Sequence, residues 1–446
     1  MSELFDHLPD QPTPAPTGLP GPRLRRPDRD QMILCPGSLD ALLPAEHMVR
    51  SVEAFVGTLD LSPLYDAIRA REGTPGHPPA DPRLIVALWL YATIDGVGSA
   101  RELARLCDTA LPYQWLCGGV SVNHHSLSDA RLACAAWLDQ ALISSIAALC
   151  QAGVVTLNTV AQDGLRVRAS AGAGSFRRRP TLERCLAEAT ARVETLKREL
   201  DGDPRASLSR REAAVRRAAA DRARRLAQAV AALPEAEARA VRNKKKAEEA
   251  RVSMTDPEAV VMKMPDGGFR PAYNAQLAAE TEHGLIAGLA VTSTGGDQPS
   301  LEPMVAQIAE RTGCQPNTVL ADGGYFNRDS VTRLTQAGVE LLIPLREPKK
   351  ADRDAGAPMA RDTAEVAALR SRMQDPATKP RYQERARWIE WVNAGMRNRG
   401  LYWFGVRGLA NVRAELGWQA MAHNFGCILR SKELRAVFGL AEPCSA

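Results

Sequence analysis

The sequence predicts an α/β protein with a mixed sheet, preceded by an all-α region that resembles a helix-turn-helix module and interrupted by a helical insertion. Three observations predict this fold class. Over residues 32–152, apolar side chains recur at helical spacing between glycine breaks. Over 153–176 and 252–346, short apolar runs typical of strands alternate with helical segments. Between these two parts, residues 177–251 carry a heptad-like apolar pattern, which indicates paired helices.

The composition is that of a globular protein and excludes several classes. Of the 446 residues, 45% are hydrophobic and 24% are charged, which excludes disorder over most of the chain. Residues 1–31 differ, because they hold seven prolines and few apolar side chains, and we expect a disordered arm there. Nine cysteines without a C-x-x-C pair argue against a disulfide framework and against a cysteine-based zinc site. No signal peptide is recognisable, so we expect a cytoplasmic protein.

The region 32–152 reads as short helices joined by glycine turns. Pro82 suits the first turn of one helix, and Ser99 with Glu102 forms a capping box for the next. A break at Cys117 to Gly119 precedes a long predicted helix, from Ser126 toward Ala152. This arrangement is typical of a DNA-binding helix-turn-helix, and equally of an ordinary helical bundle.

The insertion 177–251 carries the basic excess of the chain. It holds 21 Lys and Arg against 12 Asp and Glu, so its net charge is +9, whereas the whole chain has +5. Lys244, Lys245 and Lys246 are our candidates for contacts with DNA phosphates. The alternative is a solvated helical hairpin whose charges only keep it soluble.

Two aspartates stand where predicted strands end. Asp163 is followed by Gly164, and Asp322 follows the apolar run from Thr318 to Ala321. In open α/β sheets, ligands bind at the carboxyl ends of strands, and a following glycine lets a substrate come close. Each aspartate could instead start a turn or cap a helix.

A third group of polar residues lies on a predicted helix over residues 381–398. At about 100° per residue, Glu390 and Arg397 lie roughly 20° apart, and Tyr382 and Arg385 roughly 60° apart. A carboxylate beside cations on one helix suits metal ligation next to a phosphate clamp. An exposed amphipathic helix would show the same spacing.

Taken together, these motifs resemble the DDE-type transposases of bacterial insertion sequences, in the branch with the signature Y-x2-R-x3-E-x6-K. Here the signature reads Tyr382, Arg385, Glu390 and Arg397, with one extra residue before the glutamate and Arg in place of Lys. The segments around Asp163 and Asp322 resemble the first and second aspartate motifs of that family. The N-terminal helical region and the run from residue 407 to 424 are also similar to the family.

The resemblance implies an RNase H-like catalytic domain in which Asp163, Asp322 and Glu390 converge on two Mg²⁺ or Mn²⁺ ions. Such ions can activate water or a 3′-hydroxyl and stabilise the leaving oxygen. Arg385 and Arg397 would then hold phosphate, and Tyr382 would lie near the scissile strand. The implied partners are double-stranded DNA, as terminal inverted repeats and target, and further copies of the chain in a dimer or larger assembly on DNA. Such a protein would associate with the nucleoid.

The C-terminal part of the chain and the choice of the third acid remain to be described. We expect a linker at 347–380 and C-terminal helices over 381–446 that carry the third acid. Glu415 competes with Glu390 for that role, although we expect it to form a surface ion pair that fixes the C-terminal helix. The alternative function is a non-catalytic DNA-binding relative of these transposases, in which the acids have no catalytic part.

Overall fold

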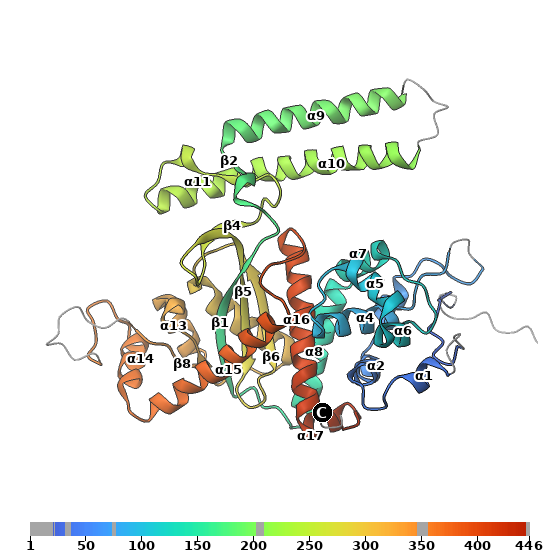
Figure 1. Cartoon of the computed structure of the whole chain (residues 1–446). Helices are drawn as coiled ribbons and strands as arrows, with labels where there is room; N and C mark the ends of the chain where they lie inside the picture. The colour runs from blue at the N-terminus through green and yellow to red at the C-terminus, as the bar shows by residue number, and fades with distance from the viewer. Residues whose placement is uncertain are drawn as a thin grey trace, which may run out of the picture.

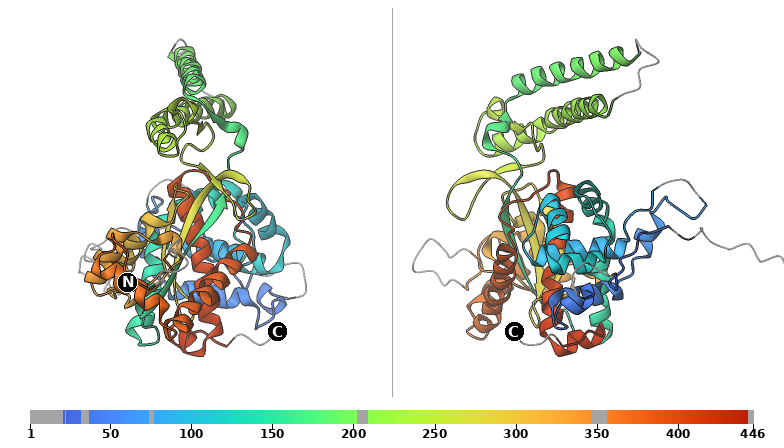
Figure 2. Two further views of the ribbon diagram at one scale, coloured as in Figure 1. Left: turned by 90° about the vertical axis from the view of Figure 1, so that its left-hand side faces the viewer. Right: turned by 45° about the vertical axis from the view of Figure 1, so that its right-hand side comes forward.

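The computed structural model describes residues 21, 23–31, 37–73, 77–201, 209–345 and 356–442. It has three parts: a group of N-terminal helices, a mixed sheet with its helices, and a helical arm that stands off this body (Figures 1 and 2). A mixed sheet behind an all-helical N-terminal region is consistent with an RNase H-like fold, as the sequence predicted.

The N-terminal part is entirely helical. Its elements are α1 (Leu39–Leu42), α2 (Met48–Thr58), α3 (Ser62–Asp66), α4 (Pro82–Ile94), α5 (Ala100–Thr109), α6 (Leu111–Cys117), α7 (His124–Ala133) and α8 (Ala135–Gln151). The α4 helix is central, because ten of its thirteen residues are buried. Ser99 caps α5 as predicted, since its hydroxyl accepts the N–H of Glu102.

Three local expectations for this part differ from the structure. The helix expected from Ser126 begins at His124, because the side chain of Asn123 is its N-cap. The long helix is bent by 57° at Cys134, between α7 and α8. Of the expected arm, residues 1–20 lie outside the described residues. Within 23–31 the backbone is bound to the helices: Arg25 N–H donates to Pro79, and Asp28 N–H to Gly118.

The sheet has six strands. They are β1 (Thr159–Arg168), β4 (Val260–Lys263), β5 (Phe269–Glu280), β6 (Ile286–Thr292), β7 (Thr318–Leu320) and β8 (Glu340–Leu342). The order is β4-β5-β1-β7-β8, with β6 also paired to β5. The β1 strand is antiparallel to β5 and parallel to β7, and it continues well beyond the end of β7. This leaves one edge of β1 open where the parallel neighbour stops.

Helices cover both faces of the sheet and connect it to the N-terminal part. They are α12 (Leu301–Thr312), α13 (Arg328–Gln336), α14 (Ala364–Gln374), α15 (Thr378–Asn398), α16 (Leu409–Arg430) and α17 (Lys432–Val437), with short 3₁₀ turns at η3 (Gln298–Ser300) and η4 (Gly323–Tyr325). The α15 helix packs on β1 and β5, whereas α16 packs on β6 and on α4 and α8 (Figure 1). One core therefore runs from the sheet into the N-terminal helices.

The segment 347–380 is not wholly the linker that we expected. Residues 347–355 lie outside the described residues, but Ala364–Gln374 forms α14, capped by Thr363. Val366 and Leu369 are buried in a cluster with α13 and β8, so this short helix belongs to the body.

The insertion forms the arm. It contains α9 (Arg179–Asp201), α10 (Arg210–Ala231) and α11 (Leu233–Arg242), and its base holds η1 (Ala173–Ser175), η2 (Ala247–Glu249) and the paired strands β2 (Phe176–Arg177) and β3 (Val252–Ser253). Leu182 and Ala189 of α9 are buried with Leu226 and Ala229 of α10, so the heptad-like positions form the seam between these helices. Pro234 stands in the first turn of α11.

Among the described helices, none is by itself long and apolar enough to cross a membrane; α7 and α8 meet that test only when taken together as a bent pair.

Candidate active site

Asp163 lies in the middle of β1, at the point where that strand outruns its parallel neighbour. Ala161 is paired with Leu320, the last residue of β7, so Asp163 lies two residues further along the open edge. On the other side, Asp163 is paired with Leu277 of β5. The expected position at a strand end was therefore wrong for β1 itself, yet Asp163 does lie where the parallel pairing ends.

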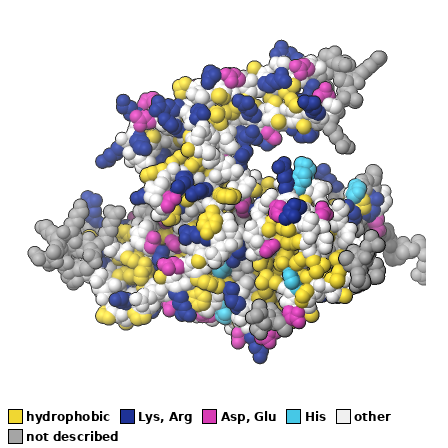
Figure 3. Space-filling model, viewed as in Figure 1, with side chains coloured by type: hydrophobic (Ala, Val, Ile, Leu, Met, Phe, Trp, Pro, Cys, Tyr) yellow, Lys and Arg dark blue, Asp and Glu magenta, His cyan; other side chains and the backbone are white. Residues whose placement is uncertain are grey.

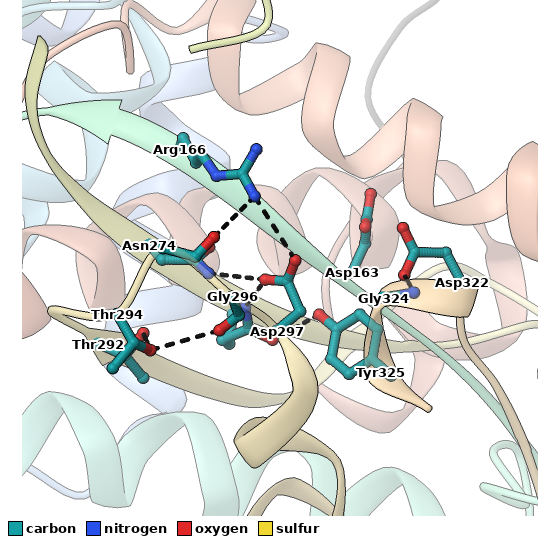
Figure 4. A network of polar contacts seen from close by, with 12 residues as sticks. Asp163, Arg166, Asn274, Thr292, Thr294, Gly296, Asp297, Asp322, Gly324 and Tyr325 are labelled. Carbon is teal, nitrogen blue, oxygen red and sulfur yellow. Dashed lines mark hydrogen bonds and ion pairs between the residues drawn. The ribbon is translucent and has the colours of Figure 1, made fainter. Parts of the chain in front are cut away.

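Asp322 follows β7 and reaches the same place. Continuing the parallel register by two residues sets Asp322 opposite Asp163. Its Oδ1 accepts the N–H of Gly324 at 2.8 Å, which makes Asp322 the N-cap of the η4 turn. The turn expected for an Asp-Gly pair is thus present, and it leaves the other carboxylate oxygen available. Figure 4 shows the Asp163 and Asp322 side chains next to each other.

Arg385 joins the two aspartates. Its Nη2 donates to Asp163 Oδ1 at 3.3 Å and lies 3.9 Å from Asp322 Oδ2. The guanidinium side chain is only 15% exposed. Burial raises the pKa of the Asp163 carboxyl, the Arg385 charge opposes that rise, and the neighbouring Asp322 and Asp297 add to it. The carboxylates therefore form an acidic centre that attracts positively charged groups.

Two more side chains of α15 complete this contact. Asn393 Nδ2 donates to Asp163 Oδ2 at 3.2 Å, and Tyr382 OH donates to the carbonyl of Ala321 at 3.4 Å. Burial raises the pKa of Tyr382. The helix thus presents Tyr382, Arg385 and Asn393 to the two strands. The sequence-based prediction missed Asn393, which lies eight residues after Arg385 and about 80° around the helix from it.

Glu390 and Arg397 lie elsewhere on α15. Both are exposed, and neither side chain forms a hydrogen bond or ion pair with a residue that the structure describes. Glu390 is about 140° around the helix from Arg385 and about 60° beyond Asn393. The structure therefore brings Asp163, Asp322, Tyr382 and Arg385 together, and sets Glu390 and Arg397 on the adjoining flank of the same helix.

Glu415, the competing acid, is committed to packing. Its carboxylate is buried, pairs with Arg131 of α7 at 3.2 Å and accepts the N–H of Gly405. The expected ion pair exists, but it is buried and not at the surface, and its partner belongs to the N-terminal helices. Glu415 thus joins α16 to α7.

A further carboxylate that the sequence reading missed lies beside the two aspartates. Asp297, just before α12, has its Oδ1 bound by the amide groups of Asn274 and Gln276 at 2.6 and 2.7 Å. Tyr325, in the η4 turn, donates its hydroxyl to Gln276. The sequence does hold a signal for this group: Asn274 and Gln276 place two amide side chains at alternate positions of a strand that is otherwise mostly apolar.

The three candidate lysines of the insertion follow α11. Lys244, Lys245 and Lys246 are all exposed, far along the chain from the acidic centre. Lys and Arg side chains are prominent over the arm (Figure 3). Nothing in the arm contradicts either reading of its charge, because the same exposed cations suit a phosphate backbone and a solvated surface.

One other acidic group stands close enough to suggest a cation. Among the described residues, ligand atoms of Glu280, Glu282 and His283 lie within 4.8 Å of one another. The buried Glu280 carboxylate, however, accepts the N–H groups of residues 282, 283 and 285, so it already has a role as the cap of the β5–β6 turn.

Comparisons with known proteins match two regions of the chain to transposases. Residues 37–132 match the family model of a transposase domain (DUF772), and residues 241–425 match that of a transposase DDE domain. No curated protein and no solved structure matches the chain. The second match spans β5, β7 with Asp322, and α15 with Arg385, and the first covers helices that share a core with them. The chain belongs to the DDE-type insertion-sequence transposases.

Proposed function

We propose that this protein cleaves DNA at the ends of an insertion sequence and transfers the strands to a target, in a reaction that depends on divalent cations. One observation carries the proposal: Asp163 and Asp322 come from neighbouring parallel strands and meet around one guanidinium group. Binding to DNA follows from the family, and its terminal repeats and target are the substrates that we propose.

The residues present fit a hard cation. Carboxylate oxygens are the donors that Mg²⁺ and Mn²⁺ prefer, and the Arg385 guanidinium shows that this pair of acids accommodates positive charge. Close to them, Asn274 Oδ1 is buried and has no hydrogen-bond partner among the described residues. When bound, two such ions would activate the attacking oxygen and stabilise the leaving one.

The side chains of the chain have separate parts in this proposal. Asp163 and Asp322 hold the cations, and Arg385 turns from these carboxylates to a DNA phosphate, for which its planar guanidinium is suited. Tyr382 of α15 donates its hydroxyl to the carbonyl of Ala321, just after β7, and would lie near the DNA strand that is cut. Glu390 is our candidate for the third acid, since it lies on the same helix; Arg397 and the lysines 244–246 are candidates for phosphate contacts. Two or more copies would act together on DNA.

The test separates chemistry from binding. Asp163→Asn should abolish cleavage in Mg²⁺ of a duplex that carries the inverted repeats flanking the coding region, while affinity for that duplex stays within about twofold. Losing a ligand of the cation removes transition-state stabilisation without removing contacts to the DNA.

Asp329→Asn is the matched control, because Asp329 is an exposed acid in the first turn of α13 whose side chain forms no hydrogen bond or ion pair within the described structure. It should cleave at the wild-type rate. Undiminished cleavage by Asp163→Asn would refute the assignment, and a wild-type protein that binds the duplex but never cuts it would favour the non-catalytic relative.

A further inference from the structure

Asp297 is a carboxylate whose two oxygens have different surroundings. Its Oδ1 accepts hydrogen bonds from Asn274 Nδ2 at 2.6 Å and from Gln276 Nε2 at 2.7 Å. Its Oδ2 accepts none from a described residue, and its nearest cation is Arg166 Nη2 at 3.8 Å. One oxygen is therefore fixed while the other stays available to a ligand.

The amide groups that fix Asp297 are costly to keep in the sheet. Asn274 and Gln276 are both fully buried on β5, and Asn274 leaves its Oδ1 without a partner among the described residues. A buried polar atom without a partner destabilises the fold, so apolar residues would be expected at these positions unless the amides served the site. Their shared target is Asp297.

The free oxygen of Asp297 points toward the turn that bears the second aspartate. A Cβ on Gly324 would lie 3.7 Å from Asp297 Oδ2 and 2.9 Å from Asp322 Oδ1, so both carboxylates flank this glycine. A Cβ on Gly164 would lie 2.4 Å from Asp297 Oδ1, so Asp297 packs on the face of β1 opposite the Asp163 side chain. Asp297 thus lies next to β1 and to the η4 turn that follows Asp322 (Figure 4).

Tyr325 ties this carboxylate to the Asp322 turn as well. Its hydroxyl donates to Gln276 Oε1, while the amide of Gln276 donates to Asp297. The polar chain therefore runs from η4 through β5 to Asp297. Within the described residues, the carboxylates of Asp163, Asp322 and Asp297 pair with two guanidinium groups, those of Arg385 and Arg166.

We propose that Asp297 is a further acidic residue of the cation centre: Asn274 and Gln276 hold its Oδ1 so that its Oδ2 adds negative charge beside Asp163 and Asp322. This inference rests on the proposed function, because it concerns the same cations. In this proposal the amides of Asn274 and Gln276 orient the Asp297 carboxylate, in the way that hydrogen-bonding groups around a metal centre orient its ligands.

Cation binding by the full-length protein tests this directly. The probe is Tb³⁺, read by its luminescence after excitation of nearby tyrosines, with Mg²⁺ as competitor. Asp297→Asn keeps the shape of the side chain and removes its charge, and the Tb³⁺ concentration that gives half-maximal luminescence should rise about tenfold or more. Asp329→Asn should leave it unchanged.

Arg166→Gln gives a second measurement of opposite sign. Arg166 is partly exposed, and among the described residues its guanidinium approaches the free oxygen of Asp297 and the carbonyl of Gly295, so its loss should spare the fold. Without this competing charge, the Tb³⁺ concentration for half-maximal luminescence should fall. A folded Asp297→Asn with wild-type cation binding overturns the proposal; if that variant fails to fold, an unchanged value in Arg166→Gln overturns it. If Asp163→Asn also binds cations normally, the proposed centre itself is wrong.

Discussion

At the scale of single residues, local sequence singled out Asp163 and Asp322 as candidates, but not the residues that surround them. Asp163 and Asp322 stood out because each interrupts an apolar run before glycine. Asp297 did not, since its role depends on contacts with Asn274 and Gln276 more than twenty residues away. Glu390 was placed by its distance from Arg385 along the signature, and the extra residue there turns it about 100° further around the helix.

Gly164 offers a residue-scale prediction. Gly164→Ala should lower the free energy of unfolding by about 1–3 kcal/mol, because the new methyl group would overlap Asp297, Gln276 and Asn274 in a packed interior. Urea denaturation measures the loss. Gly174→Ala is the control, since a Cβ there meets nothing within 4 Å; equal stability of the two variants would contradict the packing described for the site.

His423 gives a second residue-scale prediction, which concerns how the stability of the fold depends on pH. Burial lowers the pKa of this histidine to about 4, helped by Arg399 and Arg430 and opposed by the hydrogen bond to Gly284. As pH falls from 6.5 toward 4, the unfolded chain binds a proton that the folded chain does not, so stability present above pH 6.5 is lost, at up to about 1.4 kcal/mol per pH unit.

Comparison of pH 7 with pH 5 isolates this contribution. His423→Gln should lose less stability over that interval than the wild type does, while His77→Gln, at an exposed position, should lose as much. If His423→Gln shows the full wild-type loss, other groups cause the dependence.

At the scale of elements, the spacing of apolar residues predicted helices and strands correctly where those residues form the buried face of the element. Strands and helices do alternate over 252–346, and the helices predicted from Pro82 and Ser99 are present as α4 and α5. The α14 helix was missed because only Val366 and Leu369 mark its buried side in a polar segment with proline nearby. The bend between α7 and α8 lies inside one continuous apolar pattern, which gives no signal for it.

The two C-terminal helices allow a paired prediction about the third acid. Glu390→Gln on α15 should keep stability and DNA affinity but lose cleavage, because the exposed side chain makes no contact in the described structure. Glu415→Gln on α16 should lower the free energy of unfolding by roughly 3–5 kcal/mol, since it leaves Arg131 buried without its partner.

Below its unfolding temperature, Glu415→Gln should still cleave DNA. Cleavage and thermal unfolding are measured on both variants side by side. An active Glu390→Gln beside an inactive but folded Glu415→Gln would reverse the assignment.

The arm gives a prediction of its own. Replacing Lys244, Lys245 and Lys246 by Gln should weaken binding to any DNA and lower the slope of log affinity against log salt by about 0.9 for each lost phosphate contact. Replacing Lys263 and Lys432, exposed lysines of the body, serves as the control. An unchanged slope for the arm variant would return these lysines to the solvated-surface interpretation.

At the scale of the whole molecule, the proposed active centre depends on segments that are far apart in the chain. Asp163 and Asp322 are separated by the entire arm, and α15 brings Arg385 and Asn393 to them from further on. The sequence could suggest that these residues belong together only through resemblance to a family, because no local pattern encodes the parallel register between β1 and β7 or the angle at which α15 packs.

The central claim is that Asp163 and Asp322 form one cation-dependent centre for cutting DNA. Its most direct test is the cleavage rate, in Mg²⁺, of wild type, Asp163→Asn, Asp322→Asn and the double variant on a duplex carrying the flanking inverted repeats. Each single change should lower the rate on the order of 10³-fold, and the double variant should be no slower than either, because residues of one centre are not additive. Full activity of either single variant, or losses that multiply in the double variant, would contradict the claim.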